Sequence, residues 1–362
     1  MSKITSVECA LVDLEPQTVR TDATQAFVKQ ETILVTLTTD DALAGTGYSY
    51  TIGTGGRAIA EMVREYLAPA VLGADTRAVE AVWTRMLNAT RATTTGVITS
   101  LAMAGIDTAL WDIRCLRAGE PLWRVAGGAH TQLPVYDTEG GWLHLSTEDL
   151  VKGARKSQAA GLRGVKVKVG KPSAAEDAER LAAVREAVGA GFEIMVDANQ
   201  SLTTAEAIRR ARSYEPLDIA WFEEPLPADD VAGHARLARS TSTPVAVGES
   251  IYSAMRFGAY LAAGAAGIVQ ADVARIGGIT PWLKVAHAAE AFNVSISPHF
   301  LMELHVSLAA AVPNGMYVEY IPQLAAITSS SLAIVDGLVS PPSAPGLGID
   351  WNWDAIDDYR VA

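Results

Sequence analysis

Three acidic residues, Asp197, Glu223 and Glu249, recur at equal intervals of 26 residues, and each ends a short apolar segment. If these segments are parallel strands, their carboxyl ends meet at one edge and the three carboxylates converge. Converging carboxylates repel one another in a partly buried site unless a cation neutralises them, and an all-oxygen ligand set suits a hard ion. We therefore predict a Mg²⁺ site here. Glu224 alternates with Glu223 across its strand, and periodicity alone does not choose between the two.

Two lysines, Lys166 and Lys168, stand two residues apart in the segment Gly-Val-Lys-Val-Lys-Val-Gly. In a strand both project to one face, while the valines project to the other. We expect the valines to pack under helices and the lysines to enter the site. The alternative is that both lysines are solvated on an exposed strand edge and have no catalytic role, but the flanking residues give no sign of such an edge. A lysine beside a second lysine and a metal ion is pushed toward neutrality, which makes it a usable base near pH 7.

A histidine, His299, follows another short apolar segment, and Asp272 ends the segment before it. A histidine in such a place is more often a structural hydrogen-bonding group than a catalytic one. Neighbouring strands would bring the Asp272 carboxylate to the imidazole, fix its tautomer and raise its basicity. This pairing favours a second acid–base group at the same edge.

The elements that must position these residues form a regular alternation of short apolar strands and amphipathic helices over about 190 residues, which is typical of a (β/α) barrel. A doubly wound open sheet is the competing fold. We expect crossover helices at 174–188, 204–214, 232–241 and 281–292. The eight expected strands are 133–137, 164–169, 193–198, 219–224, 245–249, 267–272, 294–298 and 316–320.

The sequence before residue 126 has a different pattern. Strands are expected at 5–13, 26–39 and 45–50, followed by helices at 56–70, 75–88 and 96–117. We therefore predict an α+β capping domain over 1–125, a barrel over 126–320, and an irregular segment over 321–362 that returns to the capping domain. The polar loops 17–24 and 51–56 could cover the barrel mouth and supply substrate contacts.

Composition limits the classes of function. The formal net charge is −12, which argues against nucleic acid or an anionic membrane as the main partner. The two cysteines, Cys9 and Cys115, are too few and too far apart for a disulfide framework or a zinc site. No secretory signal and no apolar run of about 18 residues is visible, so we expect a cytoplasmic protein.

The motifs taken together resemble the enolase superfamily, and more narrowly its mandelate racemase subgroup, over essentially the whole chain. The motifs that carry the resemblance are Lys166-Val-Lys168, Val196-Asp197-Ala198-Asn199, Glu223-Glu224-Pro225, Gly248-Glu249-Ser250, Asp272 before Gly277-Gly278, and Pro298-His299.

The resemblance implies a modified TIM barrel, (β/α)₇β, with Mg²⁺ held by Asp197, Glu223 and Glu249. It implies that Lys168 is the base on one face of the substrate. It implies that the His299/Asp272 dyad is the base on the other face, and that Glu319 is an acid beside the developing enolate. It also implies that Lys166 lowers the pKa of Lys168 and contacts the substrate carboxylate. A homo-oligomer, often an octamer, is also implied.

The chemistry shared by this family is abstraction of the proton α to a carboxylate through a metal-stabilised enolate. Three segments, 136–144, 225–234 and 298–305, are similar to acid-sugar dehydratases acting on galactarate and L-talarate. The polar loop with Arg20 and Asp22 suits a polyol or a diacid, and we expect both residues and Asn199 to contact substrate. The expected function is thus a Mg²⁺-dependent dehydratase of an aldaric or aldonic acid, with loss of the β-hydroxyl.

Two alternatives remain open. A racemase or epimerase of a 2-hydroxy acid would use the same site and return the proton to the opposite face. A barrel that only binds a metal or senses a ligand is the alternative outside enzymes. The joint presence of Lys168, Asp272, His299 and Glu319 argues against that, because a binding protein needs neither two bases nor an acid.

Overall fold

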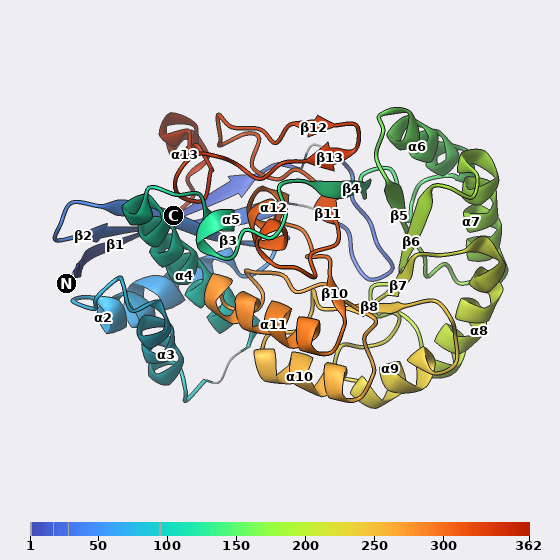
Figure 1. Cartoon of the computed structure of the whole chain (residues 1–362), viewed down its shortest axis with the longest axis horizontal. Coiled ribbons are helices and arrows are strands. Elements are labelled where there is room, and N and C mark those ends of the chain that lie inside the picture. The colour runs from blue at the N-terminus through green and yellow to red at the C-terminus, as the bar shows by residue number, and fades with distance from the viewer. Residues whose placement is uncertain (1, 17, 28, 94–95) are drawn as a thin grey trace.

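The computed structural model describes residues 2–16, 18–27, 29–93 and 96–362. Gln17, which begins one predicted loop, and Val28, within a predicted strand, lie outside the described residues. The chain forms an N-terminal antiparallel sheet with helices and a barrel of parallel strands ringed by helices (Figure 1). Within the described residues, no helix is long and apolar enough to cross a membrane.

The N-terminal sheet has the order β1-β2-β3, with every neighbouring pair antiparallel. Its strands are β1 (Ile4–Leu14), β2 (Gln30–Thr39) and β3 (Ala44–Thr51). The second strand begins at Gln30 rather than at residue 26, because Ala26 and Phe27 instead pair back to the loop at Thr21 and Arg20. The helices that follow are α1 (Gly56–Glu61), the π-helix η1 (Met62–Leu67), α2 (Ala68–Val71), α3 (Val79–Ala89), α4 (Val97–Ala118) and α5 (Leu122–Val125).

Helix α4 packs directly against β3, and glycine makes this approach possible. A Cβ atom on Gly47 would lie 2.1 Å from Oγ1 of Thr108. The close approach lets β3, the strand that carries Tyr50, pack directly on α4.

The barrel confirms the predicted (β/α)₇β fold. Strands β4 to β10 pair in parallel in chain order, and β11 pairs in parallel with β4. A parallel bridge between Ile296 and Gly315 joins the end of β10 to the segment before β11 and closes the ring. The strands are β4 (Leu133–Asp137), β5 (Gly164–Lys168), β6 (Glu193–Asp197), β7 (Trp221–Glu223), β8 (Val245–Val247), β9 (Ile268–Val269), β10 (Ser295–Ile296) and β11 (Val318–Tyr320).

Seven helices alternate with these eight strands and cover the outside of the barrel (Figure 1). They are α6 (Thr147–Ala159), α7 (Ala174–Val188), α8 (Thr204–Tyr214) with the 3-10 turn η2 (Glu215–Leu217), α9 (Val231–Ala238), α10 (Ala254–Ala262), α11 (Ile279–Ala291) and α12 (Met302–Ala311). Several strands are shorter than predicted at their carboxyl ends. The chain leaves the strand ladder before Glu249 and Asp272, so these side chains stand on the loops above the barrel.

The C-terminal segment is more regular than the sequence indicates. It contains the hairpin β12 (Ile334–Val335) and β13 (Leu338–Val339), of which β13 pairs antiparallel with β4, and the short helix α13 (Trp353–Tyr359). The end of the chain lies against the first sheet, where the carbonyl of Ala362 accepts a hydrogen bond from the N–H of Leu11 at 2.8 Å.

Candidate active site

The three spaced carboxylates converge, as the sequence predicts. Asp197 and Glu223 end β6 and β7 and are partners in the strand register, and Glu249 follows β8 by two residues. One oxygen from each lies within 4.8 Å of the others. Oε2 of Glu249 is buried and accepts no well-aligned hydrogen bond among the described residues, although Nε2 of His299 lies 3.2 Å from it. A hard divalent cation fits this set, because it would neutralise the three carboxylates.

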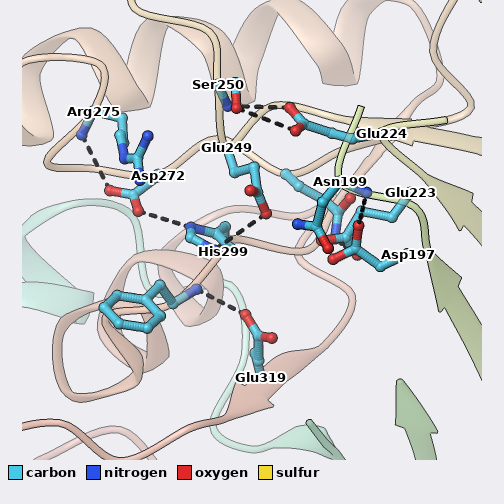
Figure 2. Close-up of polar contacts among 12 residues, drawn as sticks. Asp197, Asn199, Glu223, Glu224, Glu249, Ser250, Asp272, Arg275, His299 and Glu319 are labelled. Carbon is cyan, nitrogen blue, oxygen red and sulfur yellow. Dashed lines mark hydrogen bonds and ion pairs between the residues drawn. The ribbon is translucent and has the colours of Figure 1, made fainter. Parts of the chain in front are cut away.

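The side chains of the two adjacent glutamates, Glu223 and Glu224, point in different directions. Glu223 points into the barrel with the other two ligands, whereas the carboxylate of Glu224 accepts hydrogen bonds from the N–H and hydroxyl of Ser250 at 3.2 and 3.1 Å (Figure 2). Glu223 therefore belongs to the metal group and Glu224 does not.

Glu223 is held by residues that the sequence analysis did not identify. Its Oε2 accepts hydrogen bonds from Nε2 of Gln270 at 2.7 Å and from the indole of Trp221 at 3.1 Å. Burial, with Asp197 beside it, raises the pKa of Glu223 to about 7. Trp221 stands two residues before Glu223, so alternation along the strand could have placed it on the same face.

Both lysines of β5 are buried in the barrel mouth, on the predicted face. Nζ of Lys166 lies 2.9 Å from Glu223 and 2.8 Å from Glu319, while Lys168 donates to Asp197. Burial and Lys166 both act to lower the pKa of Lys168, as predicted for Lys166. In the protein without metal, the carboxylates of Asp197, Glu249 and Glu223 together outweigh them, and the pKa of Lys168 is raised.

The predicted pair of Asp272 and His299 is formed across the ends of β9 and β10. Nδ1 of His299 lies 2.9 Å from Oδ2 of Asp272, and its Nε2 lies 3.2 Å from Oε2 of Glu249 (Figure 2). Burial lowers the pKa of His299, but Glu249 and Asp272 raise it by more, so the net shift is upward. Asp272 is itself fixed by the N–H groups of Ala274 and Arg275 and by the hydroxyl of Tyr50.

Glu319 lies in the site but is not set up as a proton donor in the free protein. It accepts hydrogen bonds from the N–H of Phe300 at 2.8 Å and the hydroxyl of Thr138 at 2.6 Å. Burial raises the pKa of Glu319, but Lys166 and His299 lower it by more, so the carboxylate stays ionised. The expected acid role therefore requires a change in the surroundings of Lys166.

These groups open into a cavity of about 240 Å³ between the barrel mouth and the N-terminal region. A space of this order takes a small molecule rather than a polymer. Lys166, Lys168, His299 and Glu319 line it from the barrel.

Of the three residues expected to contact substrate, Asn199 and Asp22 line the cavity and Arg20 does not. The guanidinium of Arg20 instead forms an ion pair with Glu139 and donates to Gln323 at 3.1 Å. The expectation for Arg20 is corrected accordingly, because its charge is already neutralised inside the protein.

Tyr50 and Arg275 also line the cavity. Arg275 stacks over the ring of Tyr50 and donates to its hydroxyl at 3.3 Å. The sequence analysis gave no sign of Tyr50, which reaches the site from another sheet.

Comparisons with known proteins agree with this geometry. Residues 7–127 match the family described as mandelate racemase/muconate lactonizing enzyme, N-terminal domain, and residues 149–355 match the enolase C-terminal domain-like family. The chain belongs to the mandelate racemase/muconate lactonizing enzyme family of the enolase superfamily, and it is an enzyme of that family.

Among characterised relatives, the chain is 38% identical to 3,6-anhydro-alpha-L-galactonate cycloisomerase of Streptomyces coelicolor, over 94% of this chain and 95% of that protein. It is 37% identical to the L-talarate/galactarate dehydratase of Salmonella typhimurium, over 87% and 79%. A solved structure described as a racemase from Streptomyces coelicolor with bound magnesium superposes with a TM-score of 0.95 at 36% identity, covering 99% and 100%. Magnesium is thus bound in a close structural relative, and Asp197, Glu223 and Glu249 form the metal site of this chain.

Proposed function

We propose that this protein is a sugar-acid dehydratase, which removes the proton α to a carboxylate and expels the oxygen on the β-carbon as water. The observation that carries the proposal is that Lys168 and His299 line one cavity from opposite sides of the metal group. Such an arrangement supplies one group to take a proton and another to give one.

The chain's own residues can be assigned to each step. Lys166 attracts the substrate carboxylate. Lys168 takes the α-proton as the neutral amine, after its ammonium group has released a proton to solvent. Mg²⁺ held by Asp197, Glu223 and Glu249 would supply positive charge that stabilises the negative charge formed on the substrate.

His299 then completes the elimination. Asp272 keeps the ring in place, and its negative charge stabilises the imidazolium form. As the C–O bond at the β-carbon breaks, the departing oxygen takes the imidazolium proton. The product is an enol, which becomes a 2-keto-3-deoxy acid when it is protonated at C3.

A second candidate is cycloisomerisation, which the relative from Streptomyces coelicolor supports. A 3,6-anhydro sugar acid carries its ring oxygen on the β-carbon, so the same proton abstraction would break a ring ether and release no water. The two candidates share every residue role and differ only in the leaving oxygen.

The test is a panel of aldonic, aldaric and anhydro-aldonic acids, incubated with purified protein and Mg²⁺ in D₂O. A 2-keto product lighter by one water supports the dehydratase, and a 2-keto product of unchanged mass supports the cycloisomerase. Deuterium exchange at the α-carbon without a keto product would replace both with a racemase. If no acid gives either a keto product or deuterium exchange, that result would contradict the proposal.

Variants link the reaction to the site. Lys168→Ala and His299→Ala should each lower kcat at least 10²–10⁴-fold, the usual contribution of a positioned acid or base. Lys171→Ala and His287→Ala are matched controls, because Lys171 pairs with Glu176 outside the cavity and His287 is exposed on α11. Turnover that survives both site variants would show that the residue roles are wrong.

A further inference from the structure

A second histidine, His305 on α12, contacts the backbone that carries the proposed acid–base pair. His305 is only 1% exposed and is not among the residues that line the cavity. Its Nε2 accepts a hydrogen bond from the backbone N–H of Val273 at 3.0 Å. Val273 directly follows Asp272, so this hydrogen bond ties α12 to the chain segment that positions the Asp272 carboxylate.

The hydrogen bond with Val273 also fixes the tautomer of His305. A ring nitrogen that accepts from an N–H carries no proton, so the proton of the neutral imidazole is on Nδ1. Burial lowers the pKa of His305 to about 4, so the ring is neutral at neutral pH. His305 is therefore an uncharged hydrogen-bonding group and not a second acid.

The same imidazole lies close to the residue that follows His299. The backbone of Phe300 is near enough to raise the pKa of His305, although Nδ1 forms no well-aligned hydrogen bond within the described residues. The N–H of Phe300 donates to Glu319 at 2.8 Å. Phe300 has a φ of 68°, a left-handed conformation that a bulky residue adopts only where its surroundings hold it. The backbone beside His299 is thus held in a strained form between Glu319 and His305.

From these contacts, and resting on the proposed function, we propose that His305 is a positioning residue for the elimination step. It holds the segments after Asp272 and after His299 in one relative position, so that Nδ1 of His299 stays 2.9 Å from Oδ2 of Asp272 (Figure 2). Lys168 stands on β5, which is not a neighbour of β9 or β10 in the barrel. Loss of His305 should therefore impair protonation of the departing oxygen by His299 and leave removal of the α-proton by Lys168.

The experiment measures two rates in D₂O on each active acid: formation of the 2-keto product, and deuterium incorporation at the α-carbon of recovered substrate. When elimination is slow, Lys168 returns to the α-carbon a deuteron that it has gained from solvent. His305→Leu should lower kcat for the product about 10–100-fold with little change in KM, and should raise the ratio of exchange to product by a similar factor. His299→Ala should raise the same ratio, because it removes the acid itself.

Two further variants separate positioning from a general loss of structure. In His305→Gln the amide oxygen can accept from Val273, so this variant should restore most of the product rate. His234→Leu is the matched control, because His234 is fully buried on the barrel helix α9 but its ring contacts the carbonyl of Asp230 and the hydroxyl of Tyr260. It should leave the ratio of exchange to product unchanged, even where it lowers Tm.

The outcomes bear on separate claims. An equal loss of both rates in folded His305→Leu, or an equal rise of the ratio in His234→Leu, would overturn the role of His305 while the sugar-acid reaction stands. A wild type that gives no product with any acid, with or without exchange, would overturn the proposed function and this inference with it.

A measurement on the wild type keeps the inference testable if His305→Leu fails to fold. In ¹⁵N NMR of the histidine side chains, the resonances missing from His305→Gln should be those of a neutral Nδ1–H tautomer that does not titrate between about pH 6 and 8. An Nε2–H tautomer, or titration in this range, would show that His305 does not hold Val273 and would overturn the inference.

Discussion

The hydroxyl of Tyr50, on the N-terminal sheet, donates a 2.7 Å hydrogen bond to Oδ2 of Asp272, at the mouth of the barrel. The same oxygen lies 2.9 Å from Nδ1 of His299. The orientation of the His299 imidazole therefore depends on the position of a strand in the other part of the protein. Gly47 allows β3 to pack closely on α4, so this contact in the N-terminal region helps to position Tyr50 and, through Asp272, the imidazole of His299.

Replacing Tyr50 by Phe should lower kcat about 10–100-fold, the usual cost of removing a hydrogen bond that orients a site group. KM should change little, because Tyr50 acts through Asp272 rather than on the substrate carboxylate. Tyr48→Phe is the matched control, since Tyr48 is buried on the same strand and its hydroxyl has no partner among the described residues. Equal kcat values for the two variants, measured by steady-state kinetics, would show that the Tyr50 contact does not matter.

The two adjacent glutamates should differ in metal binding. Glu223→Gln should abolish the increase in Tm that Mg²⁺ gives, because the amide replaces a charged ligand. Glu224→Gln should retain it, since burial already raises the pKa of Glu224 well above its ordinary value and its carboxyl faces Ser250. At a Mg²⁺ concentration 100 times Kd, the wild type should gain about 2.7 kcal/mol in free energy of unfolding. A thermal-shift titration measures this, and equal responses of both variants would contradict the assigned ligand set.

Gly47→Ala should destabilise the fold through the contact between β3 and α4. The new methyl group would lie 2.1 Å from Oγ1 of Thr108 and 2.3 Å from the backbone of Gly105 and Ala109. We expect the free energy of unfolding to fall by at least about 1–3 kcal/mol, as for other overpacked cores. Gly96→Ala is the control, because nothing lies within 4 Å of its Cβ position. Urea unfolding of both variants checks this. Similar midpoints would mean that β3 and α4 can move apart to accept the methyl group with no loss in the free energy of unfolding.

The metal group was predictable from sequence because the barrel is a repeat. One strand and one helix add the same number of residues from Asp197 to Glu223 and from Glu223 to Glu249, so equal spacing puts equivalent positions at one edge. The alternation of side chains along β5 likewise fixed the direction of Lys166 and Lys168.

The features that sequence missed depend on contacts between distant segments. Tyr50 reaches Asp272 across 222 residues and Arg20 reaches Glu139 across 119, and no local period relates either pair. The net direction of the Lys168 pKa in the metal-free protein was not predictable for a different reason. It depends on the distances from the Lys168 ammonium to Asp197 and to Lys166, and strand alternation does not give these distances.

The last prediction concerns Asp107, which joins the N-terminal helix α4 to the start of the barrel helix α11. Its oxygens accept hydrogen bonds from the N–H and hydroxyl of Thr280 at 2.9 and 2.7 Å. Burial raises the pKa of Asp107 from 3.8 to about 7, against the effect of these donors. Between those pH values the folded protein holds a proton that the unfolded chain has released. The contribution of the protonated Asp107 carboxyl to the free energy of unfolding is therefore complete below about pH 4 and is lost as the pH rises through 7.

Asp107→Asn should remove this part of the pH dependence, because the amide does not titrate and can still pair with Thr280. From pH 4 to pH 8, the free energy of unfolding of the variant should rise relative to wild type by on the order of a few kcal/mol. Urea unfolding at each pH in the presence of a chelator gives the difference directly, and other shifted carboxyls such as Asp112 cancel from it. Asp40→Asn corrects for the loss of one surface charge. A difference between Asp107→Asn and wild type that stays constant over this range would show that the Asp107 carboxyl is not held protonated by burial.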